Sequence, residues 1–200
     1  MNTESIFLKQ QQLGPMDNFI YWIGDPKTRH MAIVDPAWDL NTILSTIESE
    51  RYQLKMVLLT HGHFDHCNAL DEVLNKYDIP VYLSSKEAPS LTPNVPQLIR
   101  TDHEQIISLG DIDITCLHTP GHTPGGQCFW FQNQLIAGDT LFTNGCGRCD
   151  LDNSNVDDMY TSLFKVLQIL PDDTIIYPGH DYGDIPNDTW KHQKETNRFL

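Results

Sequence analysis

The sequence has few basic residues for its length. Its 200 residues contain 13 Lys and Arg against 27 Asp and Glu, which gives a formal net charge of −14 at pH 7. A chain with this excess of negative charge is repelled by phosphate backbones and by anionic membrane surfaces. Nucleic acids and membranes are therefore disfavoured as partners, and we expect a small-molecule substrate.

Cysteines and long apolar runs are also scarce. The five cysteines are an odd number and too few for a disulfide-stabilised scaffold. The longest apolar runs, such as residues 56–59 and 128–131, have the length of a strand and not of a membrane span. The first residues lack the apolar core of a secretory signal. These features predict a reduced, cytoplasmic protein.

Internal repeats and low-complexity linkers are absent, and 200 residues correspond to one ordinary domain. Strand-like and helix-like segments alternate at both ends of the chain, with a run of strand-like segments between them. Helical patterns cover about residues 40–51, with Asp39 as the cap, then 68–77 and 156–170, and a terminal helix begins near residue 188. This order predicts stacked sheets with helices outside.

The polar residues of chemical interest stand in turns directly after strands. The densest group is His61-x-His63-x-Asp65-His66, which provides four metal ligands within six residues. Neutral imidazole suits zinc and iron, and carboxylate oxygen tolerates either ion. Because alternate residues of an extended segment point the same way, His61 and His63 are placed to face one ion, with Asp65 and His66 turned toward a second position. Surface histidines and a helix cap formed by Asp65 are the alternatives.

Three further candidates follow strands elsewhere in the chain. His122 lies in a loop rich in glycine and proline, Asp139 follows Ala-Gly, and His180 follows Tyr-Pro-Gly. Each is weak alone, because a histidine in a turn is usually solvated and an Asp after Gly often forms a turn. Together with the first group they repeat one pattern, which is a strand, a glycine and a ligand. The repetition favours a common metal centre.

In this order the motifs resemble the metallo-β-lactamase superfamily, and more closely its glyoxalase II-like branch, over nearly the whole chain. The resemblance implies one α/β domain over residues 1–200, an αββα sandwich of two mixed sheets flanked by helices. It also implies two divalent metal ions, one held by His61, His63 and His122, the other held by Asp65, His66 and His180, and both bridged by Asp139. Zinc is the first expectation, and iron and manganese suit the same ligands.

Two divalent ions about 3.5–4 Å apart can share a water and lower its pKa to about 7. The resulting hydroxide attacks a carbonyl that one metal polarises, so no protein nucleophile is required. Asp65 is a candidate to orient this metal-bound water through its free oxygen. The first hypothesis is therefore a metal-dependent hydrolase of a thioester or ester, similar to glyoxalase II, which is the hydroxyacylglutathione hydrolase that cleaves S-lactoylglutathione.

One departure from glyoxalase II concerns its C-terminal helical domain, which holds glutathione. This chain ends 20 residues after His180, so we expect that domain to be absent and the thiol or alcohol part of the substrate to be held differently. The second hypothesis is a persulfide dioxygenase, which the chain resembles in residues 145–148 and 177–182. Those enzymes use one iron, held in this numbering by His61, His122 and Asp139, a ligand set expected for non-haem iron.

The same resemblance makes Arg148 and Tyr182 candidate substrate contacts. For Arg148 the alternative is a surface ion pair, and for Tyr182 it is packing against the terminal helix. Cys146 and Cys149 form a C-x-x-C in a loop, for which we expect a structural role because a redox pair normally opens a helix. A non-catalytic metal module, a nuclease and an exported β-lactamase fit the sequence less well. A homodimer is compatible with it.

Overall fold

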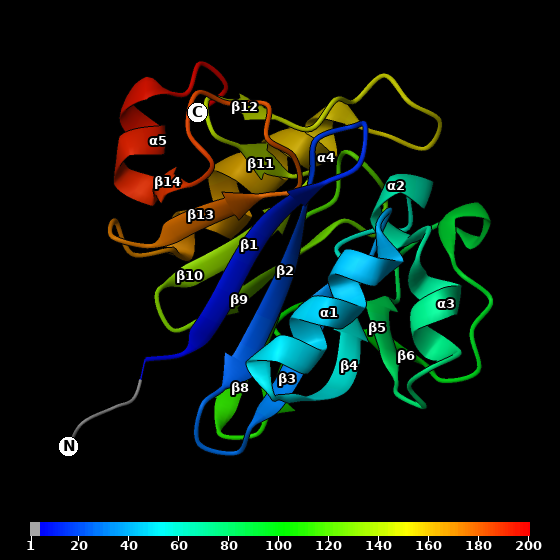
Figure 1. Ribbon diagram of the computed structural model, residues 1–200. Helices are drawn as coiled ribbons and strands as arrows, with labels where there is room; N and C mark the ends of the chain where they lie inside the picture. Colours follow the sequence, from blue (N-terminus) through cyan, green and yellow to red (C-terminus); the bar gives the residue numbers. More distant parts are fainter. Residues whose placement is uncertain (1–4) are drawn as a thin grey trace.

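Six strands form the first sheet of the computed structural model, which describes residues 5–200 (Figure 1). In spatial order they are β1 (Phe7–Leu13), β2 (Asn18–Asp25), β3 (His30–Val34), β4 (Gln53–Leu58), β5 (Val81–Ser84) and β6 (Leu98–Thr101). The pairs β1–β2 and β2–β3 are antiparallel, whereas β3–β4, β4–β5 and β5–β6 are parallel. The sheet is therefore mixed.

A second mixed sheet packs on the first. Its strands in spatial order are β14 (Asp188–Thr189), β13 (Ile175–Pro178), β10 (Gln134–Gly138), β9 (Gln127–Phe131), β8 (Ile112–His118) and β7 (Ile106–Leu109). Only β10 and β13 pair parallel within it. A small hairpin of β11 (Leu141–Phe142) and β12 (Gly145–Cys146) stands beside this sheet.

Helices cover the outer faces of both sheets. On the first sheet lie α1 (Leu40–Glu50) and α3 (Leu70–Leu74), with α2 (Phe64–Cys67) at its edge; on the second lie α4 (Val156–Thr161), η2 (Ser162–Val166), η3 (Leu167–Ile169) and α5 (Trp190–Thr196) (Figure 1). A short 3-10 turn, η1 (Pro89–Leu91), follows β5. The layer order is helix, sheet, sheet, helix, which confirms the αββα sandwich.

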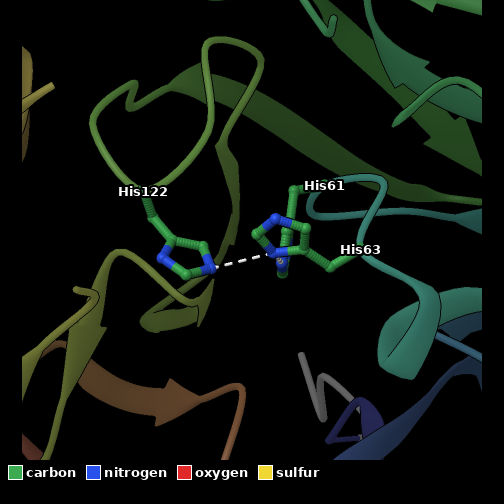
Figure 2. Close-up of side chains that lie close together, drawn as sticks. All are labelled: His61, His63 and His122. Atoms are coloured by element: carbon green, nitrogen blue, oxygen red, sulfur yellow. Dashed lines mark hydrogen bonds between the residues drawn. The ribbon is translucent and has the colours of Figure 1, made fainter. Parts of the chain in front are cut away.

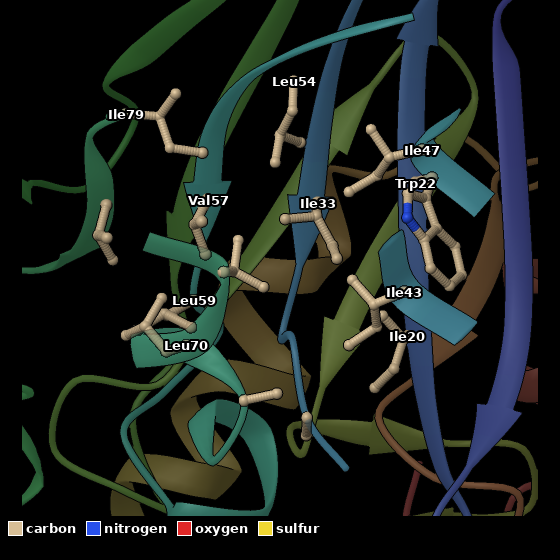
Figure 3. Close-up of a cluster of buried hydrophobic side chains, with 14 of the residues drawn as sticks. Ile20, Trp22, Ile33, Ile43, Ile47, Leu54, Val57, Leu59, Leu70 and Ile79 are labelled. Carbon is tan, nitrogen blue, oxygen red and sulfur yellow. The ribbon is translucent and has the colours of Figure 1, made fainter. Parts of the chain in front are cut away.

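Strand alternation divides the core into three layers. In β2, Ile20 and Trp22 face the helices on the first sheet, while Tyr21 and Ile23 face the second sheet. This follows from the two-residue period of a strand, and because both faces are covered the whole of β2 is buried. Figure 3 shows the layer under α1, where Ile20, Trp22 and Ile43 lie together.

The helix predicted at residues 68–77 is wrong in its bounds. The chain forms α2 earlier, over two of the predicted ligands, then bends and forms the short α3. Tertiary hydrogen bonds hold the bend: the Trp38 N–H donates to the Asn68 side chain (2.6 Å) and the Ala69 N–H donates to the Pro36 carbonyl (3.2 Å). The local pattern carries no information about these partners, so it predicted one longer helix.

The structure differs from the sequence-based expectation in two further elements, the helical segment that begins at residue 156 and the edge strand β1. The helix predicted at residues 156–170 is helical as far as Ile169, but only residues 156–161 are α-helix, and the segment continues through a π turn and a 3-10 turn. The edge strand β1 was not predicted, because its Lys-Gln-Gln-Gln run is polar and only half-buried. In residues 5–200 no helix has the length and apolar character needed to cross a membrane. The secretory-signal expectation falls partly on residues 1–4, outside the described part.

Candidate metal centre and active-site cleft

Four connections meet at one edge of the sandwich, where strands of both sheets end. The loop after β4 carries residues 61–66, the loop after β8 carries His122, and the turns after β10 and β13 carry Asp139 and His180. The backbone joins the two sheets at this edge, since the Phe19 N–H of β2 donates to the Gly179 carbonyl (2.8 Å). The fold thus gathers all seven predicted ligands in one place.

The first group of ligands is His61, His63 and His122. His63 Nδ1 lies 3.0 Å from His61 Nε2 and 3.0 Å from His122 Nε2, so three ring nitrogens converge (Figure 2). His61 and His63 come from the extended segment before α2, and His122 reaches them from the opposite loop. The alternation predicted for His61 and His63 is therefore present, and the third nitrogen is supplied from the other sheet.

The second group is Asp65, His66 and His180. His66 Nε2 lies 3.2 Å from His180 Nε2, and Asp65 Oδ2 lies 3.5 Å from each of these nitrogens. Asp139 stands between the two groups. Its Oδ2 lies 3.3 Å from His122 Nε2 and 3.4 Å from His180 Nε2, and its Oδ1 lies 3.4 Å from His66 Nε2. This is the place that a bridging carboxylate would occupy.

Hydrogen bonds behind the rings aim the histidine nitrogens at the centre. The far nitrogen, Nδ1, is bonded in four of the five histidines, with these partners: Thr60 Oγ1 for His61 (3.0 Å), Asp35 Oδ2 for His66 (2.9 Å), the Arg148 carbonyl for His122 (2.9 Å) and the Met16 carbonyl for His180 (2.8 Å). Such bonds fix the tautomer and leave Nε2 free as a ligand. His63 is turned the other way and presents Nδ1.

Two supporting side chains, which belong to the residues that carry the family resemblance, were assigned no role from the sequence. Asp35 accepts hydrogen bonds from the Thr60 backbone (2.8 Å), the Thr60 hydroxyl (2.6 Å) and His66. The Asn18 amide donates to Asp65 Oδ2 (3.0 Å) and accepts from the Trp38 ring N–H (2.7 Å). In the sequence, Asn18 and Asp35 are visible only as polar residues at the start of the apolar strand β2 and directly after the apolar strand β3. That position does not show which side chains they bind.

The pKa values of the clustered histidines are shifted in opposite directions. Burial lowers the pKa of His61 well below its ordinary value, and burial together with His122 lowers the pKa of His63 to about 4. Both rings are therefore neutral at pH 7, which is the form that a metal ligand requires. Burial also acts to lower the pKa of His66, but the carboxylates of Asp139, Asp35 and Asp65 outweigh it and raise that pKa to about 9. The negative charge of these carboxylates therefore stabilises a positive charge at this place, either a proton or a metal ion.

The residues fit divalent metal ions. Within residues 5–200 the buried Oδ1 of Asp139 has no hydrogen-bond partner, and a buried acceptor without a partner is costly unless a cation or donor meets it. The imidazole nitrogens also lie only 3.0–3.2 Å apart, so their lone pairs repel one another unless a cation binds between them. Imidazole and carboxylate are the ligands that zinc and non-haem iron accept. The donor set does not distinguish between these metals.

A cleft of about 750 Å³ opens directly over this centre. Ligands form part of its lining, and its walls are mainly apolar: Met16, Phe64, Leu91, Phe142 and Leu151. Tyr182 and Arg148 also line it, as predicted for substrate contacts. The Tyr182 ring is 55% exposed and stacks on His180 with centroids 4.5 Å apart, while the Arg148 guanidinium bonds Asp150 (2.6 and 2.7 Å). Their roles as contacts stay predictions.

Fold and site together define a class of protein: αββα sandwiches with a cluster of histidines and aspartates for divalent metals at the shared edge of the sheets. Residues 13–180 match the metallo-beta-lactamase superfamily, and the chain belongs to it. The chain is an enzyme of the metallo-hydrolase type.

Relatives and solved structures support the same assignment. The chain is 37% identical to "Probable polyketide biosynthesis zinc-dependent hydrolase PksB" of Bacillus subtilis, covering 92% of this chain and 81% of that one. It is 35% identical to a hydroxyacylglutathione hydrolase of Photorhabdus laumondii, covering 92% and 70%. The crystal structure of ETHE1 from Myxococcus xanthus superposes with a TM-score of 0.88 at 28% identity, covering 96% and 83%. TTHA1623 in a di-iron-bound form has a TM-score of 0.83 at 28% identity, covering 96% and 100%.

Proposed function

We propose that the protein is a metal-dependent hydrolase that cleaves a thioester or ester whose acyl group is apolar. The observation that carries the proposal is the cleft, in which apolar walls lead to predicted metal ligands. His61, His63 and His122 would hold one ion, Asp65, His66 and His180 the other, and Asp139 both. Two divalent ions held there would supply the water activation and carbonyl polarisation that hydrolysis at neutral pH requires.

The residues of the described part that line the cleft include no activated serine or cysteine nucleophile. Cys146 lines it, but burial raises the pKa of the Cys146 thiol to about 11, so the thiol is protonated at neutral pH. Ser90 also lines it, and within residues 5–200 its hydroxyl forms no hydrogen bond with a histidine or carboxylate that would act as a base. These two observations support water as the attacking group.

Asp65 is suited to handle the proton of that water. Asn18 fixes Oδ2 through its amide and also donates to the Asp65 backbone carbonyl (3.0 Å). Asp65 lines the cleft, and among the described residues its second oxygen, Oδ1, accepts no hydrogen bond. A carboxylate within reach of the attacking water orients it and takes its proton as the new C–O bond forms.

The walls of the cleft favour an apolar acyl group over a charged one. Phe64 is 63% exposed and Met16 is 37% exposed, so the entrance presents apolar surface that a substrate would cover. Histidines aside, Arg148 is the one basic side chain of the described residues that lines the cleft, and Asp150 already pairs with it. Apolar burial contributes about 0.8 kcal/mol per CH₂.

A series of acyl thioesters of increasing chain length tests the proposal, with thiol release as the readout and S-lactoylglutathione in the same panel. We expect kcat/KM to rise by up to about fourfold per buried CH₂. Asp139→Asn should lower kcat/KM by at least about 100-fold, because stabilisation by the metal ions is worth several kcal/mol. Asp173→Asn, in the exposed turn before β13, is the matched control. Zinc-loaded protein that cleaves no thioester or ester faster than Asp139→Asn would refute the proposal.

A mononuclear iron persulfide dioxygenase is the second candidate. It is favoured by the similarity to the ETHE1 structure and by the proximity of His122 Nε2 and Asp139 Oδ2, at 3.3 Å, which suits a two-histidine, one-carboxylate iron site. Elemental analysis separates the two candidates. Close to two ions per chain supports the hydrolase, whereas one iron per chain with oxygen uptake on glutathione persulfide supports the dioxygenase.

A further inference from the structure

A buried glutamate outside the ligand set joins the two loops of the first ligand group. Glu87 follows β5 and is 5% exposed. Its Oε2 accepts from the Gly62 N–H (3.1 Å) and from the Thr123 hydroxyl (3.0 Å). Its Oε1 accepts from the Ala88 N–H (2.9 Å) and the Gly125 N–H (3.3 Å). One carboxylate therefore collects four donors from three segments of the chain.

The positions of these donors connect Glu87 with the ligands. Gly62 lies between His61 and His63, and Thr123 directly follows His122. Close packing accompanies the hydrogen bonds: a Cβ at Gly125 would lie 2.3 Å from the Glu87 Cα, and a Cβ at Gly62 would lie 1.6 Å from the Leu91 carbonyl oxygen. The backbone of residues 87–91 thus lies against both ligand loops, which leaves little room for either loop to shift.

The burial of Glu87 is unfavourable for stability, which argues against a purely structural role. No basic side chain among residues 5–200 forms an ion pair with it, so its charge is buried and stabilised only by uncharged donors. Burying a carboxylate is unfavourable unless hydrogen bonds of this kind offset the loss of hydration. Three of the four partners are backbone N–H groups, which can only donate, so in either orientation a glutamine would turn its amide N–H₂ toward at least one of them.

We propose that Glu87 is a positioning residue, which sets the separation of the His61–His63 loop and the His122 loop and thereby the metal affinity of the first group. The inference rests on the metal binding assumed in the proposed function, but not on its substrate. The second group does not depend on Glu87, because Asp65, His66 and His180 are held by Asn18, Asp35 and the Met16 carbonyl. Loss of Glu87 should therefore weaken one metal site and spare the other.

The test measures zinc affinity of metal-free protein by competition with a chromophoric chelator, in two backgrounds. His180→Ala removes a ligand of the second group, and His122→Ala removes a ligand of the first. We expect Glu87→Gln to lower zinc affinity about 10- to 100-fold in the His180→Ala background and less than about threefold in the His122→Ala background. Glu72→Gln, an exposed glutamate on α3, is the matched control and should change neither.

A spectroscopic readout separates positioning from general loosening. In the His180→Ala background, Glu87→Gln should also change the visible absorption of bound Co²⁺, which reports ligand geometry, while Glu72→Gln leaves it unchanged. Equal loss of affinity in both backgrounds, or no loss in the first, would overturn the proposal. If Glu87→Gln does not fold, Thr123→Val removes one of the four hydrogen bonds, and Thr123→Ser should restore it. The same selective loss, smaller in size, is then expected, and its absence overturns the proposal.

Because the readouts are metal affinity and a Co²⁺ spectrum, they do not depend on thioester turnover. A protein that binds zinc as expected but cleaves no thioester or ester refutes the proposed function and leaves Glu87 in its role. If the protein cleaves thioesters but Glu87→Gln weakens both metal sites equally, the proposed function stands and the role of Glu87 is refuted.

Discussion

Each buried carboxylate of this protein is surrounded by a different set of donors. Asp35 binds Thr60 and His66, Glu87 binds four uncharged donors, and Asp139 faces histidines. Asp25, far from the cleft, accepts from the Lys27 N–H (3.0 Å), the Thr28 hydroxyl (2.6 Å) and the Asp111 N–H (2.8 Å). It ties the end of β2 to the turn between β7 and β8.

Asp25 should contribute a pH-dependent part of the stability. Burial alone would raise the pKa of Asp25, but these hydrogen bonds outweigh it and lower the pKa to about 2. The stabilisation is therefore complete above the unfolded pKa of about 3.9 and disappears as the pH falls toward 2. We expect Asp25→Asn to cost about 1–2 kcal/mol at pH 6 and to flatten the fall in stability between pH 4 and 2.

Urea unfolding of the metal-free protein at a series of pH values measures this effect, since metal release then plays no part. The exposed Asp113→Asn, on neighbouring β8, is the control. An Asp25→Asn protein that loses stability with acid as steeply as the parent would contradict the prediction.

At the scale of elements, α4 is connected directly to the site. The Asn155 side chain caps the helix by accepting from the Asp157 N–H (2.8 Å) and the Asp158 N–H (3.1 Å). The Asn155 backbone N–H donates to the Gly121 carbonyl (2.8 Å), next to His122. The start of α4 therefore supports the loop that carries a predicted ligand.

Removing the cap should lower stability without removing the loop contact, because the backbone hydrogen bond does not depend on the side chain. We expect Asn155→Ala to cost about 1 kcal/mol and to lower Tm by about 2–4 °C. Asn155→Asp retains an acceptor at the same place and should keep Tm within about 1 °C of the parent. Differential scanning calorimetry measures both variants, and equal melting of the alanine variant and the parent would be evidence against the cap.

At the scale of the molecule, the metal centre joins the two sheets. Residues 61–66 follow β4 of the first sheet, whereas His122, Asp139 and His180 follow strands of the second. A metal that binds ligands from both sheets binds the folded state only, so its binding energy adds to the stability of the sandwich.

Chelation should therefore lower Tm. At free metal 100 times Kd, one site adds about 2.7 kcal/mol, which corresponds to roughly 5–10 °C for a protein of this size. Thermal unfolding with and without chelator measures the shift, and readdition of zinc should restore it. In Asp139→Asn, which lacks the bridging carboxylate, the shift should be much smaller. An equal shift in Asp139→Asn would show that the metal binds elsewhere.

Much of the fold and the candidate site was open to prediction from local patterns. The apolar runs at residues 56–59 and 128–131, which lie in and next to β4 and in β9, and the capped helix α1 were evident from local patterns. The short group His61 to His66 was evident because its ligands are close in sequence. The polar strand β1, the bend at Asn68 and the role of Glu87 depend on partners distant in the chain, which no local pattern contains.

The sequence by itself indicated stacked sheets with helices outside and the short ligand-like group at residues 61–66, because strand and helix periods and the spacing of those histidines are properties of contiguous residues. The αββα sandwich and the full set of candidate ligands were implied by the family resemblance of the motifs. Only the tertiary structure decided that Asn18 holds Asp65, that Glu87 joins two ligand loops and that apolar side chains wall the cleft. These features arise where strands of two sheets end side by side. Hydrogen bonds and packing there depend on distances of a few ångströms between residues that the chain separates widely.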